Sequence, residues 1–296
     1  MRETTWRNIG TDVSTETTVS GILTAAGLDY TVEKQPIFLA NGAQIPKKCA
    51  TVKSTGTPIG VVGDNYEIYQ NDEAFGFVAD IPNIQFEKAG ETATGMVYII
   101  GKLPELKVLN DSFVPYVIFQ TSHNGRYNVR ATICPLRIVC QNQFAYSFKQ
   151  VRNTIDIRHS RQLPSKVAQA QALLRDTATY MAGFTNTAEE LAMLKIGSKD
   201  NFYAIVDRFF DSTRELSERQ ARAIESQREF FIQCYNADDN ANFTGTAWGV
   251  VNAFSDFTTH REVKKTKTAA DSKFMSVTFD PNIEKLLNCI RAQVAA

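Results

Sequence analysis

The chain has 296 residues, of which 43% are hydrophobic, and its 32 basic and 32 acidic side chains cancel. This composition supports a folded core and excludes a chain that is disordered over most of its length. Zero net charge also excludes a protein that coats nucleic acid by uniform positive charge, so any such binding would need charges segregated on one surface.

Apolar runs and cysteines indicate the compartment. The longest apolar runs, such as 96–100 and 114–119, are far shorter than the roughly 20 residues of a membrane helix. The charged N-terminus has no apolar stretch behind it. We therefore expect no signal peptide, no membrane association and a cytoplasmic location. Five cysteines without a CxxC spacing predict free thiols rather than disulfides or a zinc site.

The first part of the chain predicts a short helix followed by hairpins. The helix is expected at 17–26, where Thr and Ser lie near the start and Gly27 follows the end. Residues 28–63 form three runs rich in β-branched and aromatic side chains. Asn41-Gly42 and Thr55-Gly56 separate these runs and predict hairpin turns.

Further strands are predicted as far as residue 159. Asn71 is expected to cap a helix at 71–81, and strands are expected at 83–90, 95–103, 114–122, 126–133 and 153–159. A turn at 123–125 joins two of them, because Asn-Gly tolerates the positive φ of a tight hairpin. Residues 136–149 fit a helix about as well as a strand, and we favour a helix there.

Beyond Pro164 the sequence predicts helices. One is expected at 166–183 and ends at Gly183. Thr187 with Glu190, and Ser217 with Gln220, match the capping box and are expected to open two more. The other predicted helices are at 198–210, 246–260 and 282–294.

These elements predict an α+β fold. Its N-terminal half is an antiparallel, meander-rich sheet with helices, and its C-terminal half is mostly helical. The predicted boundary separates a mixed domain at 1–160 from a helical region at 161–296, which packs on it either as a separate domain or as part of one continuous domain.

Positive charge is concentrated between Arg126 and Lys166, a stretch that contains eight Lys or Arg and one acidic residue, Asp156. Aromatic side chains and the amide run 141–143 lie among these bases, a pattern that suits a surface that tracks phosphates and stacks on bases. A solvated sheet face fits the same residues equally well. A second basic cluster lies at 261–267.

The candidate contacts to nucleic acid are drawn from both clusters. They are Arg126, Tyr127, Arg130, Arg137, Asn142, Tyr146, Lys149, Arg152, Arg158, His159, Arg161, Lys264 and Lys265.

Motifs for catalysis are weak. The flanks of His123, His159 and His260 show no metal-ligand spacing, which favours structural roles for the three histidines. The glycines match neither a phosphate-binding loop nor a dinucleotide-binding loop. We therefore assign no catalytic residue and no metal ligand, expect no cofactor, and favour a non-enzymatic role.

Several segments resemble one family. These are Trp6 to Gly10, LDYTVEKQPIF, GVVGDNYEIYQNDEAF, EKAGETATGMVYIIGKL, TSHNG, ATICPLRIVCQNQF, IRHS and GTAWGVVNAFSDFTTHR. The chain is similar in them to the phage/plasmid-like proteins of domain-of-unknown-function family 932 (DUF932). Gln143 stands where many members have Thr. The resemblance implies a mobile-element protein that acts in the cytoplasm of a bacterial host.

The leading functional hypothesis is a phage- or plasmid-encoded protein that binds or anneals single-stranded DNA in replication or recombination, as a homo-oligomer. Phosphate contacts and base stacking would provide the binding. The alternative is an interaction protein that binds a host protein, such as a defence protein. The third hypothesis is a metal-dependent enzyme that uses the three histidines.

Overall fold

The structure is a computed structural model. It describes residues 9–76, 78, 81–109, 111–137, 142–143, 154–160, 177–211, 215–261 and 282–295. Within these ranges it has the predicted α+β fold, with antiparallel strands in the N-terminal half and helices in the C-terminal half.

The larger sheet has eight antiparallel strands in the described part of the chain, and we call it the main sheet. Its order is β1-β5-β6-β8-β9-β10, with β7 paired to β8 and β11 paired to β9. The strands are β1 (Thr11–Asp12), β5 (Gln85–Glu91), β6 (Met96–Lys102), β7 (Leu106–Val108), β8 (Asp111–Ser122), β9 (Val129–Arg137), β10 (Asn142–Gln143) and β11 (Thr154–Ile157).

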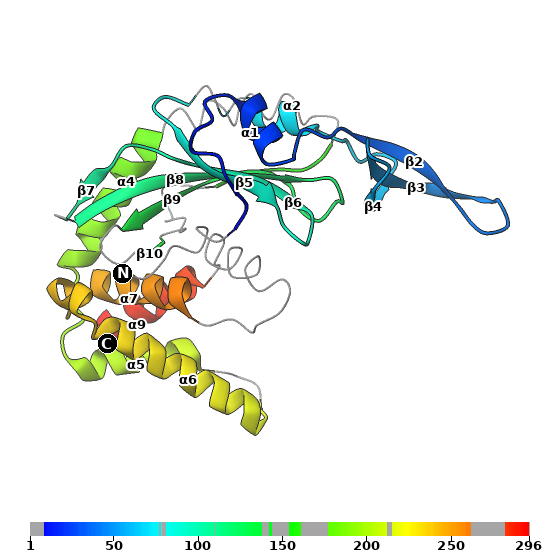
Figure 1. Cartoon of the computed structure of the whole chain (residues 1–296). Helices are drawn as coiled ribbons and strands as arrows, with labels where there is room; N and C mark the ends of the chain where they lie inside the picture. The colour runs from blue at the N-terminus through cyan, green and yellow to red at the C-terminus, as the bar shows by residue number, and fades with distance from the viewer. Residues whose placement is uncertain are drawn as a thin grey trace.

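The central strands of the main sheet are buried on both faces. Val97 and Ile99 of β6 belong to the same apolar cluster as residues of α1 (Val19–Ala25) and α2 (Asn71–Phe75), which lie over one face (Figure 1). Met96 and Ile100 alternate with them and pack into a second cluster on the other face. Burial of both faces explains why β6 is apolar throughout rather than alternating.

A smaller sheet projects from the body, and we call it the arm. It consists of β2 (Val32–Phe38), β3 (Gln44–Lys53) and β4 (Pro58–Gly63), joined in that order by hairpins. The predicted turns are confirmed: Gly42 and Gly56 have φ of 83° and 84°, which glycine adopts without strain. The far end of the arm extends away from the rest of the molecule (Figure 1).

The root of the arm is clamped by one side chain. Gln70, just before α2, accepts a hydrogen bond from the Val32 backbone N–H at 3.0 Å and donates one to the Val32 carbonyl at 2.8 Å. The Gln70 amide thus pairs with β2 much as a neighbouring strand would. Lys34 also donates from its ammonium group to the carbonyls of Asp64 and Tyr66.

The helical half packs through aromatic side chains. Its helices are α4 (Thr177–Met193), α5 (Lys199–Phe210), α6 (Glu218–Tyr235), α7 (Ala247–His260) and α9 (Ile283–Val294), with a 3₁₀ helix at Asp238–Phe243. Phe184 of α4 contacts Phe113 of β8 and Trp248 of α7, at ring-centroid distances of 5.5 and 5.9 Å. The apolar cluster is therefore continuous from the main sheet into the helices. None of the described helices is long and apolar enough to span a bilayer.

The Ser217 capping box is confirmed at the start of α6, but the Thr187 box is not formed. Helix α4 passes through Gly183 without ending, and the Thr187 hydroxyl, inside the helix, donates to the Gly183 carbonyl at 2.9 Å. Phe184 and Ala188 are fully buried on this helix. Their packing offsets the weak helix preference of Gly183, which alone suggested a break.

The predicted cap of α2 is wrong by one residue. Gln70 is the N-cap, and Asn71 is the first helical residue. The side chain of Asn71 is buried, and it donates to the Leu28 carbonyl at 2.7 Å. Its amide is therefore used between segments rather than at the helix end.

The helix favoured at 136–149 is not found where the structure describes this segment. Leu136 and Arg137 end β9, and Asn142 and Gln143 form β10, paired with Arg137 and Leu136. Strand pairing here adds to the main sheet, a gain that periodicity within one segment cannot indicate. The other residues of 136–149 lie outside the described ranges.

Candidate functional site

The structure divides the predicted contact residues between two ends of the main sheet. Arg126, Tyr127, Arg130, Arg158 and His159 lie at the end formed by the β8–β9 turn and the end of β11, which we call the turn end. Arg137 and Asn142 lie at the opposite end of β9, which at about 3.3 Å per residue is roughly 26 Å away. The other predicted contacts lie outside the described residues; they are Tyr146, Lys149, Arg152, Arg161, Lys264 and Lys265.

Arg137 is a buried structural residue, with an exposed fraction of 2%. Its Nε atom donates to Asp111 at 2.8 Å, and its terminal nitrogen donates to the Asp239 carbonyl at 2.9 Å. Its guanidinium also lies 5.4 Å from the Phe243 ring centroid. Because its charge and its donors are used inside the fold, we leave Arg137 out of the binding surface.

The arginines of the turn end differ in their partners. Arg130 pairs with Asp156, which lies opposite it in the β9–β11 register, so much of its charge is neutralised. Arg126 and Arg158 are exposed, and within the described chain no acidic side chain pairs with either. Tyr127 is half-buried, and its hydroxyl donates to Thr94 at 2.9 Å, so its ring is held against the body.

His123 lies buried where the arm, α2 and the main sheet meet. Its exposed fraction is 1%, and its Nε2 atom lies 2.8 Å from the Asn71 side-chain oxygen. The Asn71 amide group already donates to Leu28, so His123 is the donor in this contact. Burial, followed by the positive charges of His159 and Lys53, lowers the pKa of His123 to about 4. This histidine is therefore neutral at pH 7.

His159 forms a second contact at the same junction. Its ring stacks on Tyr66 with a centroid distance of 4.7 Å, and its Nδ1 atom lies 3.0 Å from the Glu67 carbonyl. The Tyr66 hydroxyl donates to the Ser122 carbonyl at 2.7 Å. Burial lowers the pKa of His159 as well. Both histidines thus join the connection between β4 and α2 to the main sheet.

His260 does not join the other two histidines. It lies at the end of α7, where its Nε2 atom is 3.8 Å from Asp256. In the part of the chain that the structure describes, no three His, Cys, Asp or Glu side chains are grouped so that they could hold a metal ion. The junction of His123 and His159 is therefore best described as a structural joint.

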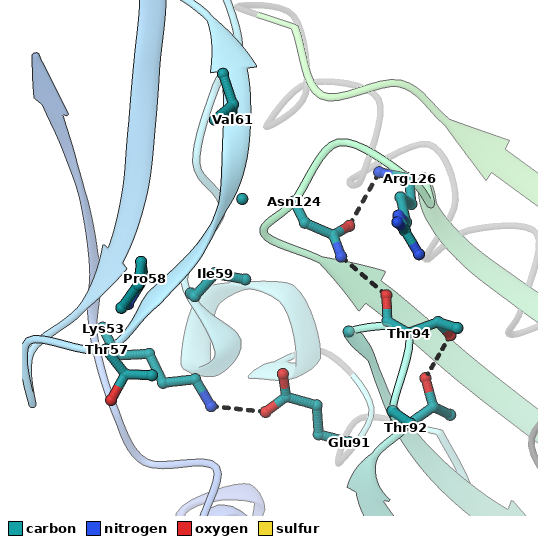
Figure 2. A pocket seen from close by; sticks show the side chains of 13 residues that line it. Lys53, Thr57, Pro58, Ile59, Val61, Glu91, Thr92, Thr94, Asn124 and Arg126 are labelled. Carbon is teal, nitrogen blue, oxygen red and sulfur yellow. Dashed lines mark hydrogen bonds and ion pairs between the residues drawn. The ribbon is translucent and has the colours of Figure 1, made fainter. Parts of the chain in front are cut away.

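A cleft of about 500 Å³ lies between the arm and the turn end. Figure 2 shows its two walls: Pro58, Ile59 and Val61 come from β4, whereas the residues of the facing wall come from the turns of the main sheet. That facing wall includes Thr92, Thr94, Asn124 and Arg126. The Lys53 ammonium group and the Glu91 carboxylate form a 2.7 Å ion pair across the cleft.

Two glycines allow the walls to approach Asn124. A Cβ atom on Gly60 would lie 2.7 Å from the Asn124 Cβ, and one on Gly95 would lie 2.4 Å from the Asn124 side-chain nitrogen. Asn124 is fixed in turn, because it donates to the Thr94 carbonyl at 2.8 Å and accepts from the Arg126 backbone N–H at 3.0 Å. The wall that carries Arg126 is therefore rigid.

The positive charge on the arm was not predicted from the sequence. Residues 32–63 contain four lysines and one glutamate, and Lys47 and Lys48 are exposed on β3. Phe38 and Leu39 lie at the tip and are 57% and 52% exposed. The adjacent lysines Lys47 and Lys48 indicate this charge in the sequence, but the excess of basic over acidic residues is larger at 126–166.

Comparison with known families identifies the family of the chain. Residues 58–278 match the family described as Domain of unknown function (DUF932). The chain belongs to this family. The DUF932 match begins at β4 and includes the cleft wall at 91–126, His123 and His159, whereas β2 and β3 precede it. No curated protein and no solved structure showed similarity to the chain at the level required for a match.

Proposed function

We propose that this DUF932 protein binds single-stranded DNA with the arm and the turn end of the main sheet. The observation that carries the proposal is the exposed pair Lys47 and Lys48 on the arm, a thin sheet that stands away from the body (Figure 1). A projecting sheet with excess positive charge can follow a phosphate backbone without burying its own charges.

Both chemical groups needed for sequence-tolerant binding are exposed on this surface. Lys47 and Lys48 supply charge near the middle of the arm, and Phe38 supplies an exposed ring at its tip. Bases of any sequence stack on aromatic rings, whereas cations bind phosphate. Phe38 is 57% exposed, so its ring is accessible to a base.

The turn end extends the positive surface toward the body. Arg126 and Arg158 are exposed there, and no described acid neutralises them. Arg130 contributes less, because Asp156 pairs with it. The binding surface that we propose therefore contains Lys47, Lys48, Arg126, Arg158 and Phe38.

The biological role proposed here is binding or annealing of single strands in replication or recombination of a phage or plasmid, as a homo-oligomer in a bacterial cytoplasm. This context rests on the resemblance of the quoted motifs to phage/plasmid-like proteins. An annealing role would add faster pairing of complementary strands to simple binding.

Fluorescence anisotropy with a labelled oligonucleotide tests the proposal. If Lys47, Lys48, Arg126 and Arg158 each neutralise one phosphate, the log–log slope of affinity against salt is expected to be roughly −2.8. The double variant Lys47→Gln/Lys48→Gln should make the slope shallower by about 1.4.

A matched control removes the same number of charges elsewhere. Arg219 and Arg222 are exposed on α6, which lies far from the arm (Figure 1). The variant Arg219→Gln/Arg222→Gln should keep the slope of the unchanged protein. Binding that is absent at low salt, or that both double variants weaken equally, would contradict the proposal.

A protein partner is the second candidate, and the apolar tip favours it. Phe38 and Leu39 together form an exposed pair that a host protein could cover. Under this alternative, Phe38→Ser/Leu39→Ser abolishes capture of a host protein, and the protein shows no salt-dependent affinity for DNA.

A further inference from the structure

Two contacts join the walls of the cleft between the arm and the turn end, so the cleft is not a continuous groove. Lys53 of β3 and Glu91 of β5 join its walls through their ion pair, and Gly60 of β4 contacts Asn124 of the β8–β9 turn (Figure 2). A strand of nucleic acid cannot pass through a space that is bridged twice. The cleft volume of about 500 Å³ lies instead in the range of small-ligand pockets.

The two walls of the cleft have different chemistry. The β4 wall presents Pro58 and Ile59, whereas Val61 lies at its edge and is 59% exposed. The facing wall contains Thr92 and Thr94, whose hydroxyl groups lie 3.0 Å apart and bond to each other, so one hydroxyl proton remains for a ligand. A ligand that fits both walls has one flat apolar side and one side rich in hydrogen-bonding groups.

The charges of the cleft favour an anion. Glu91 is compensated, since it accepts from the Lys53 ammonium group at 2.7 Å and from the Tyr30 hydroxyl at 3.1 Å. Lys53 is held further by the Tyr30 ring, whose centroid lies 3.8 Å from its nitrogen. Arg126 adds a charge that no described acid offsets. The net charge of the three ionised side chains is therefore +1.

We propose that the cleft binds one nucleotide through its phosphate monoester. The phosphate contacts Arg126 and the one available threonine hydroxyl, and the base lies against Pro58 and Ile59. Guanidinium binds phosphate by paired, charge-assisted hydrogen bonds, and apolar side chains cover the face of a base. The proposal rests on the proposed function for its class of ligand, but it needs no contact with the tip of the arm.

Isothermal titration calorimetry with deoxyadenosine 5′-monophosphate and with deoxyadenosine tests the site. The monophosphate is expected to bind at least about tenfold more tightly, because the nucleoside lacks the charge-assisted contact. Arg126→Gln should abolish this difference between the ligands, whereas Ile59→Ser should weaken both. Arg219→Gln, a remote exposed position, should change neither affinity.

Two oligonucleotides identify the source of the nucleotide. If a strand end occupies the cleft, a 5′-phosphorylated oligonucleotide binds more tightly than its 5′-hydroxyl form and competes with the monophosphate. If a free nucleotide occupies it, the two oligonucleotides bind alike while the monophosphate still binds. Either result supports the site.

The site is refuted if the monophosphate binds no more tightly than the nucleoside, or if Arg126→Gln leaves their ratio unchanged. The thermal melting temperature of each variant, measured by circular dichroism, confirms that it is folded. Binding of the 5′-hydroxyl oligonucleotide tests the proposed function alone. A failure of the nucleotide site is thereby distinguishable from a failure of strand binding.

Discussion

The two ends of strand β9 place arginine in opposite environments. At one end Arg137 is buried, paired with Asp111 and bonded to the backbone of Asp239 in the helical half. At the turn end Arg126 is exposed and lines a cleft, and Arg158 is exposed at the same end of the sheet. One basic stretch of sequence therefore holds the fold together at one end and leaves exposed positive charge at the other.

This contrast shows that charge density along a sequence does not measure charge on a surface. Arg130 is intermediate between the two cases, because its partner Asp156 is itself partly exposed. The functional value of each arginine depends on whether an acid lies opposite it in the folded sheet. Substitutions and pH changes at these side chains test the contrast between buried, paired charge and exposed charge.

Loss of the Arg137 side chain should have the largest effect. Arg137→Met leaves Asp111 without its partner and the Asp239 carbonyl without its donor, and breaking a buried pair in this way costs about 3–5 kcal/mol. Urea unfolding measures the change in free energy. Arg158→Met, at the exposed position, should stay within about 0.5 kcal/mol of the unchanged protein. Similar losses in the two variants would contradict the contrast.

Acidification should weaken the joint at the turn end. The folded-state pKa of His123 is about 4, below its usual value of 6.5, so the unfolded chain binds the proton first. Its contribution to stability is complete above pH 6.5 and is lost as the pH falls toward 4, a difference of about 3 kcal/mol.

Urea unfolding between pH 7 and pH 4 measures this loss. Carboxylates also titrate in the range, so the comparison is made with His123→Gln, which keeps a polar side chain but cannot be protonated. The variant should lose less stability over the interval. Parallel curves for the two proteins would show that His123 is not the group responsible.

A comparison of two glycines separates the energetic cost of close packing at the cleft wall from the cost of backbone strain. Gly95 and Gly42 have φ of 82° and 83°, but only a Cβ on Gly95 would meet Asn124. Alanine at either position carries the cost of a left-handed backbone, about 1–2 kcal/mol. Gly95→Ala should cost more than Gly42→Ala in thermal unfolding, and it should also weaken nucleotide binding. Equal losses of stability in the two variants would mean that Asn124 moves to accommodate the added Cβ without a measurable energetic cost.

The smallest effect is expected at the Arg130–Asp156 pair. Because both side chains are partly exposed, Asp156→Asn should change stability by only about 0.2–1 kcal/mol. The same change removes the carboxylate that offsets the charge of Arg130, so affinity for single strands should rise in anisotropy titrations. A fall in affinity would place Asp156 rather than Arg130 at the binding surface.

Local patterns in the sequence predicted most elements of this fold. The Asn41-Gly42 and Thr55-Gly56 turns, the buried strand at 95–103 and the Ser217 capping box depend on neighbouring residues, and each is present. The Thr187 box failed although its pattern is the same, because Phe184 and Ala188 are buried on a helix that continues through it. Local rules hold until packing opposes them.

The surface was harder to predict than the fold. Asp111 lies 26 residues before Arg137 in the sequence, and Asp239 lies 102 residues after it, so the pairing appears only when the sheet and the helices are assembled. The cleft likewise combines β4 with two turns of another sheet. Long-range register determines which charges remain free, and no spacing within one segment encodes it.

The projecting arm also has a mechanical consequence. Strand β3 has ten residues, a length of about 33 Å, and its inner end carries Lys53 at the cleft. The arm is anchored at its inner end by the two hydrogen bonds between Gln70 and Val32. A modest force on Phe38 at the tip exerts a large torque at the root, where it would strain the Lys53–Glu91 bridge. Under the proposed binding of a DNA strand at the tip, tension in that strand would act on the same bridge.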